Sequence, residues 1–259
     1  MKSQYKISYY LRIVITIIAY VIFYYYIINS CLHAESKSQL YFNIIIGVIF
    51  GGLAILAEYL RMNYDAATKN LVIDCKPDKA LEKIERVEKV DIFRTYKTSC
   101  QMMRMLALVD LRRFPELLSY VDSIETKEYD VELIRKYSQM LAYGEQGQRG
   151  KSNEAFKKLV QVREYRTNKG KRFKGAYFLN WEVVNGQHKN YEGDYEGAMR
   201  YLNDIDEKNM NLRELVQYLL AKLLAAKKLG RQEIYDNCKE RLIKSTQNNQ
   251  VMRDYIETI

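Results

Sequence analysis

The residues whose types and spacing come closest to a chemical site are the nine of segment 144–152, GEQGQRGKS. In a phosphate-binding loop, backbone amides and a Lys placed like Lys151 cradle a nucleotide. The motif requires its first glycine at position 145, but that residue is Glu145 and the nearest glycine is Gly144. The preceding segment also has helical rather than strand periodicity. We therefore interpret residues 144–152 as a turn between helices and expect no cofactor.

This chain contains few residues that could support metal or thiol chemistry. The two histidines, His33 and His188, are too few for a histidine-based metal site or a catalytic triad. The four cysteines lie far apart, and none is part of a Cys-x-x-Cys pair. We expect reduced and mostly buried thiols at Cys31, Cys75, Cys100 and Cys238.

Carboxylates occur in pairs, but neither pair is accompanied by a nucleophile and a base at a recognisable spacing. Glu82 and Glu85 fall on a polar helix face, and Glu192 and Asp194 fall in a turn. General acid–base and nucleophilic catalysis both need partners within hydrogen-bonding reach. We therefore expect a protein that is not an enzyme.

The densest basic stretch, residues 163–177, interleaves cations with aromatic residues. Such charge runs are usually solvated faces, and a turn between helices is the first interpretation. The second is contact with an anionic lipid surface, which we favour over nucleic acid. The side chains that would make this contact are Lys169, Lys171, Arg172 and Lys174.

The elements that position these residues begin with two long apolar runs, residues 13–28 and 40–57. A helix needs about 20 mostly apolar residues to cross a membrane, and each run reaches this length with its Tyr-rich flanks. We predict transmembrane helices near 8–28 and 39–59, which form a hairpin over residues 1–61. A cleaved secretory signal is the competing interpretation of the first run, but a second run follows it directly.

Orientation follows from the basic residues beside the two spans. Lys and Arg flank the hairpin at both outer ends, whereas the connecting loop 29–39 contains only Lys37. The positive-inside rule therefore places both termini, and the polar domain of residues 62–259, in the cytoplasm. Residues 61–259 hold 37 Lys and Arg against 30 Asp and Glu, and this net charge of +7 suits a domain beside an anionic leaflet.

The second span carries small residues at helical spacing, Gly47, Gly51 and Ala54. Helices approach closely in lipid where side chains are small. We expect this face to pack against the first span of the same chain, with homodimerisation through Gly47 and Gly51 as the alternative.

The polar domain shows an all-helical pattern, because its apolar residues recur every three or four positions and only two prolines interrupt it. Short connections join these segments, as in antiparallel helical hairpins. The predicted helices are 77–89, 92–111, 115–125, 129–143, 152–165, 171–185, 194–205, 211–228, 231–244 and 248–257.

The second helix of each hairpin begins with a recurring pattern. Its anchors lie at Pro77, Phe114, Ser152, Tyr195 and Arg231, spaced by 37, 38, 43 and 36 residues. An apolar or small residue follows on the same helical stripe at Ile84, Val121, Leu159, Leu202 and Cys238. Glycine precedes three of the anchors, at Gly150, Gly193 and Gly230, where a turn can use a positive φ angle.

The chain resembles the tetratricopeptide repeat family at residues 193–202, GDYEGAMRYL, with Leu202 in place of the family's Phe. Weaker copies occur at 111–121 and 225–231. The spacing exceeds the family's period of about 34 residues, and the first-helix Trp-Leu-Gly positions are mostly lost. The resemblance implies an all-α protein in which two transmembrane helices precede a solenoid of stacked helical hairpins.

The resemblance also implies a partner-binding groove lined by the first helices. Its matching positions in this chain are Ser99, Met102, Tyr137, Met140, Asn180 and Val183. We expect a membrane-anchored scaffold that binds another protein or a peptide. The alternative is a membrane-bound regulatory or enzymatic subunit that depends on nucleotide or nucleic acid.

Overall fold

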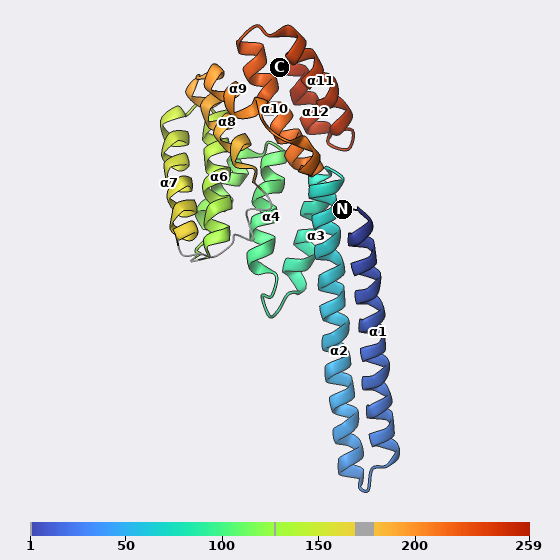
Figure 1. The fold of residues 1–259 in the computed structure, drawn as a ribbon. Helices are drawn as coiled ribbons and strands as arrows, with labels where there is room; N and C mark the ends of the chain where they lie inside the picture. Colours follow the sequence, from blue (N-terminus) through green and yellow to red (C-terminus); the bar gives the residue numbers. More distant parts are fainter. Residues whose placement is uncertain (1, 127, 169–178) are drawn as a thin grey trace. The chain divides into compact units, whose positions relative to one another are not determined.

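The computed structural model describes residues 2–126, 128–168 and 179–259, and every regular element within these ranges is a helix (Figure 1). The chain divides into two compact units, residues up to 61 and residues 62–259. The prediction of an all-helical protein is confirmed for this part of the chain.

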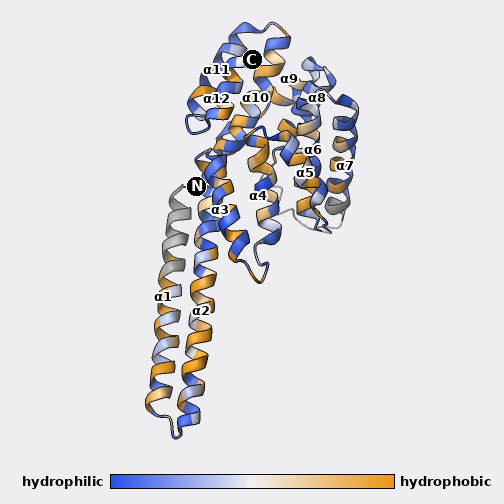
Figure 2. Cartoon of the chain, turned by 180° about the vertical axis from the view of Figure 1, so that it is seen from behind, coloured by the Kyte–Doolittle hydropathy of each residue, from blue (hydrophilic) through white to orange (hydrophobic). Residues whose placement is uncertain are grey.

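The first unit contains two long helices, α1 (Lys2–Leu32) and α2 (Lys37–Thr68), of which α2 continues into the second unit. Both helices are long and apolar enough to cross a membrane. Figure 2 shows apolar residues along both of them. Large side chains such as Val21, Ile22 and Phe42 point outward and are exposed, which suits a helix surrounded by lipid.

The two helices of the first unit are joined by a tight turn. The Ser36 hydroxyl accepts a hydrogen bond from the Gln39 amide at 3.2 Å, as at the start of a capped helix. Further along, Asn43 donates to the carbonyl of Ser30, and the rings of Phe23 and Phe50 lie 6.2 Å apart. These contacts make α1 and α2 an antiparallel hairpin.

In the second unit, α2 continues into a short π-helix, η1 (Lys69–Ile73), and the described residues that follow form ten α-helices. A further 3₁₀ turn, η3 (Glu207–Asn209), precedes α10. The α-helices are α3 (Pro77–Val90), α4 (Lys97–Asp110), α5 (Phe114–Ser123), α6 (Tyr129–Glu145), α7 (Arg149–Asn168), α8 (Trp181–Glu192), α9 (Tyr195–Asn203), α10 (Leu212–Lys228), α11 (Gln232–Ser245) and α12 (Gln250–Thr258).

Helices of the second unit pack in an alternating order. The helices α4, α6, α8 and α10 contact one another in succession, and α5, α7, α9 and α11 each pack against the helix before them. In addition, α10 packs against η1, so a helix near the end of the second unit contacts the segment at its start. We call α4, α6, α8 and α10 the inner helices because they surround the polar core described below.

The predicted apolar stripe of the alternate helices is confirmed by burial. Its five positions, from Ile84 to Cys238, are all buried, and Ala198 between Tyr195 and Leu202 is fully buried as well. At the same crossing, a side chain at Gly186 of α8 would meet Leu202 of α9 within 3.0 Å. Small residues at Gly186 and Ala198 therefore let α8 and α9 approach closely.

The turns agree with prediction at two of the three glycines. Gly193 and Gly230 have positive φ angles of 86° and 67°, which only glycine adopts without strain. The prediction for Gly150 is wrong, because Gly147 takes the positive φ and α7 has already begun at Arg149.

Two predicted helices begin later than expected. The segment expected at 92–111 becomes helical only at Lys97, because the carboxylate of Asp91 binds the amides of Thr95 and Tyr96 and forms a turn. The helix expected at 171–185 is found as α8, which starts at Trp181 because Asn180 caps it. Residues 171–178 lie outside the described part of the chain.

Candidate functional site

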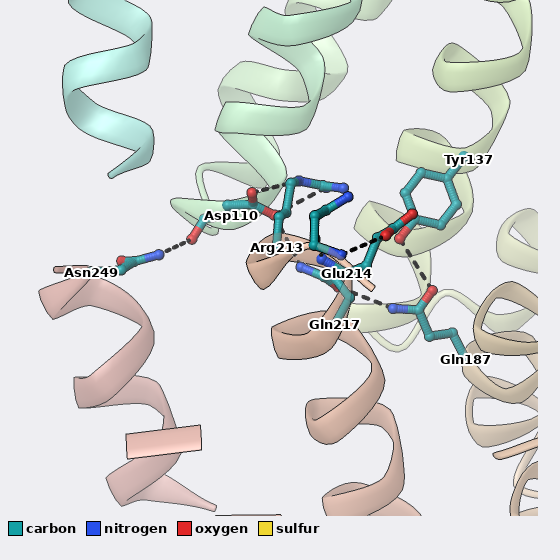
Figure 3. Close-up of polar contacts among 8 residues, drawn as sticks. Asp110, Tyr137, Gln187, Arg213, Glu214, Gln217 and Asn249 are labelled. Atoms are coloured by element: carbon teal, nitrogen blue, oxygen red, sulfur yellow. Dashed lines mark hydrogen bonds and ion pairs between the residues drawn. The ribbon is translucent and has the colours of Figure 1, made fainter. Parts of the chain in front are cut away.

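An ion pair is buried at the centre of the second unit. The guanidinium of Arg213 in α10 donates two hydrogen bonds to the carboxylate of Asp110 in α4, at 2.7 and 3.1 Å (Figure 3). The side chains are only 3% and 4% exposed. Charges this deeply buried are tolerated only when they are paired and hydrogen-bonded, so the pair joins α4 and α10 at a defined register.

Amide and hydroxyl groups extend this pair across all four inner helices. Gln217 of α10 donates to Asp110 at 3.0 Å, and Gln187 of α8 donates to Gln217 at 3.0 Å. Tyr137 of α6 then donates to Gln187 at 3.3 Å (Figure 3). Each inner helix therefore contributes at least one side chain to a single hydrogen-bonded chain, which we call the polar core.

Burial governs the ionisation of the polar core. Burial raises the pKa of the Asp110 carboxyl, and Arg213 and Gln217 offset this in part. Burial also raises the pKa of Tyr137 to about 12 and that of the nearby Cys75 thiol to about 12. Tyr137 and Cys75 therefore stay protonated and unreactive near neutral pH.

The C-terminal helix α12 lies against the inner helices. The side chain of Asn249, just before α12, donates to the carbonyl of Asp110 at 3.2 Å. Tyr255 donates to the carboxylate of Glu145 in α6 at 3.2 Å, and its ring lies 3.2 Å from the guanidinium carbon of Arg112. An amphipathic helix is therefore seated on this side of the domain, with Met252 and Ile256 buried.

A cavity of about 20 Å³ lies where α12 meets the inner helices. This volume is close to the space of one water molecule. Its walls come from all four inner helices and from α12, and they include Val109, Leu141, Glu145, Gln187, Tyr191, Gln217, Leu220 and Met252. Met252 belongs to α12 itself, and we call the rest of this wall, which faces α12, the inner face. The inner face is a close fit to α12.

The contacts of the polar core join helices that are distant in the sequence. Within the described residues, no group of three or more His, Cys, Asp or Glu side chains could hold a metal ion. Asp110 and Arg213 hydrogen-bond to each other, and Asp110 also accepts a hydrogen bond from Gln217. The chemical role that this geometry supports is to hold the helices in one register.

The six positions predicted to line a groove lie mostly in the interior. Met102, Tyr137, Met140 and Val183 are buried. Ser99 is partly exposed, and Asn180 is used as the cap of α8. The structure brings Tyr137 into the polar core and Asn180 and Val183 next to a smaller cavity. The four buried side chains are inaccessible to a partner in this conformation.

The small residues predicted on the second span face the first span of the same chain. A side chain on Gly47 would meet Ile27 at 3.0 Å, and one on Gly51 would collide with the Tyr24 hydroxyl. The backbone carbonyl of Ala54 accepts a hydrogen bond from Tyr20 at 3.4 Å. Close packing within the hairpin therefore accounts for Gly47, Gly51 and Ala54.

The remaining predicted residues fall in two places. Lys169, Lys171, Arg172 and Lys174 lie outside the described residues. The glycine-rich segment 144–152 forms the end of α6, a turn and the start of α7. There the ammonium of Lys151 lies 5.4 Å from the centre of the Tyr143 ring.

Sequence reasoning missed the residues of the polar core. Asp110 ends the apolar run 105–109, and Arg213 and Gln217 interrupt the broad apolar face of residues 212–224. A charged residue on an otherwise apolar helix face is the signal that could have identified them. No family model, no curated protein and no solved structure matches this chain.

Proposed function

We propose that this protein is a membrane-anchored helical-repeat scaffold, similar to tetratricopeptide repeat proteins, that binds another protein at the cytoplasmic face of the membrane. The observation that carries the proposal is the succession of α4, α6, α8 and α10, each followed by an outer helix that packs on it. Stacked helical pairs of this kind build extended surfaces that bind protein segments. Two helices apolar enough to cross a membrane would hold that surface beside the bilayer.

The contacts between the inner face and α12 favour one kind of partner, an amphipathic helix. The inner face already holds an amphipathic helix through buried apolar side chains and through the Tyr255–Glu145 hydrogen bond. A partner helix with the same character would find matching contacts, as in helix-in-groove recognition. Such a partner has to replace α12, whereas a partner on the outer helices does not.

The test is recovery of a partner by tagged full-length protein from solubilised membranes, with candidates identified by mass spectrometry. A true partner should be recovered with the full chain and lost with the fragment 1–76, which keeps the hairpin and lacks the stacked pairs. Produced separately, it should also bind the purified full-length protein directly. Recovery of the same proteins with the hairpin fragment would contradict the scaffold proposal.

Two variants refine this experiment. Truncation after Gln247 removes α12 and should increase recovery if the partner uses the inner face, with helical circular dichroism as the folding control. Lys151→Ala should leave recovery unchanged, because an exposed side chain at the start of α7 contributes little. Magnesium-dependent nucleotide binding that disappears in the Lys151 variant would favour the nucleotide-dependent alternative instead.

A further inference from the structure

The turn between α3 and α4 exposes two consecutive large apolar side chains. Ile92 is 71% exposed and Phe93 is 65% exposed. In the described part of the second unit, no other two consecutive large apolar residues are both exposed. Single exposed apolar residues are ordinary, but an adjacent pair at the tip of a turn marks a surface that is covered in the working state.

The turn is held in this shape by its own hydrogen bonds. The Asp91 carboxylate accepts from the Thr95 amide at 3.0 Å and from the Tyr96 amide at 2.6 Å. The Asp91 carbonyl accepts from the Arg94 amide at 3.0 Å, and Arg94 has a positive φ of 55°. Because the backbone is fixed, Ile92 and Phe93 are presented outward without further ordering on contact.

Three basic residues flank the exposed pair in the sequence, and we call them the basic ring. Lys89, Arg94 and Lys97 are all exposed, and none of them forms an ion pair within the described part of the chain. The nearby acids are occupied, because Asp91 caps the turn and Glu88 pairs with Arg104 at 2.6 Å. An apolar tip within a basic ring is complementary to an anionic lipid surface, where the apolar groups enter and the cations meet headgroups.

The fold of the second unit keeps this turn close to the helix that carries the second candidate span. The ring of Tyr96 lies 4.9 Å from the ring of Tyr64 in α2. Lys83 of α3 also reaches Asn63 of α2, at 3.5 Å.

From these observations we propose that the turn 91–96 is a second membrane contact, in which Ile92 and Phe93 enter the headgroup region of an anionic leaflet. This contact does not depend on which protein the domain binds.

The test uses the full-length protein in vesicles of phosphatidylcholine and phosphatidylglycerol. A single tryptophan is placed at the tip by Phe93→Trp, in a background where the natural Trp181 is replaced by Trp181→Phe. Its emission should shift to shorter wavelength and fall roughly twofold when brominated lipids replace ordinary ones, because quenching needs contact with the lipid. The matched control is Tyr201→Trp in the same background, since Tyr201 is exposed on α9, and it should not be quenched.

A second arm tests the basic ring. The added changes Arg94→Gln and Lys97→Gln should reduce quenching of the tip tryptophan in anionic vesicles, and vesicles of phosphatidylcholine alone should reduce it in the same way. Helical circular dichroism should stay unchanged in every variant, since the altered tip side chains are exposed. Water-like, unquenched emission from position 93 in anionic vesicles would overturn the proposal, as would a blue shift that appears only on addition of another protein.

Discussion

The buried ion pair offers the sharpest test of the fold, through the substitution Asp110→Ala. The change leaves the guanidinium of Arg213, whose side chain is 3% exposed, without its carboxylate. Breaking a buried pair by removing one partner typically costs about 3–5 kcal/mol. Domains of this size shift their melting temperature by about 2–4 °C per kcal/mol, so the melting temperature should fall by about 6–20 °C.

An exposed Arg–carboxylate pair between two other helices serves as the control that separates burial from pairing. Arg231 binds both oxygens of Glu196 at 2.8 Å and joins α9 to the start of α11, but the two side chains are 38% and 61% exposed. Exposed pairs contribute about 0–1 kcal/mol, so Glu196→Ala should lower the melting temperature by at most about 4 °C.

The assay is thermal unfolding of the full-length protein in lipid nanodiscs, followed by helical circular dichroism and by Trp181 fluorescence. The double variant Asp110→Leu with Arg213→Met should recover most of the lost stability, because replacing a buried pair by apolar groups is often neutral. A decrease for Asp110→Ala no larger than that of the Glu196→Ala control would refute the buried ion pair.

Three further predictions concern the register, the topology and the pH dependence. Ala198→Glu should melt well below wild type, because overpacking a buried site costs about 1–3 kcal/mol before the buried charge is counted, whereas the exposed control Tyr201→Glu should not. For topology, a membrane-impermeant thiol reagent on intact cells should label Ser36→Cys and not Glu257→Cys; the reverse would invert the orientation. At neutral pH, Asp194→Ala should be less stable than Asp194→Asn. The backbone amide of Gly197 holds the pKa of the Asp194 carboxyl below its usual 3.8. The ionised carboxylate should therefore stabilise the fold above pH 3.8, and this stabilisation should be lost as the pH falls through the lowered pKa, as melting experiments at several pH values would show.

The sequence predicted those parts of the fold that depend on local periodicity. The two apolar helices and the buried stripe from Ile84 to Cys238 follow from the spacing of side chains along single helices. The start of α4 was missed because Asp91, a side chain that hydrogen-bonds to the backbone, outweighed a continuous helical pattern. The start of α8 was missed in the same way, since Asn180 sets it.

The polar core was not predictable from spacing, because its partners are distant in the chain. Asp110 and Arg213 are 103 residues apart, and nothing local in either segment identifies the other. The groove residues were carried over from a family in which stacked pairs form an open curve. Here α10 packs against η1 and α12 lies against the inner helices, so Met102, Tyr137, Met140 and Val183 are buried.

The long separation between these contacts has a consequence for synthesis in the cell. During translation at about 5–20 residues per second, Asp110 is made roughly 5–20 s before Arg213 and waits without its partner for that time. Asn248 then bonds to the carbonyl of Asp74 across 174 residues, so the first helices of the domain meet their last partner only when the chain is almost complete. Until release from the ribosome, the nascent domain is therefore an incomplete set of helices with exposed apolar faces.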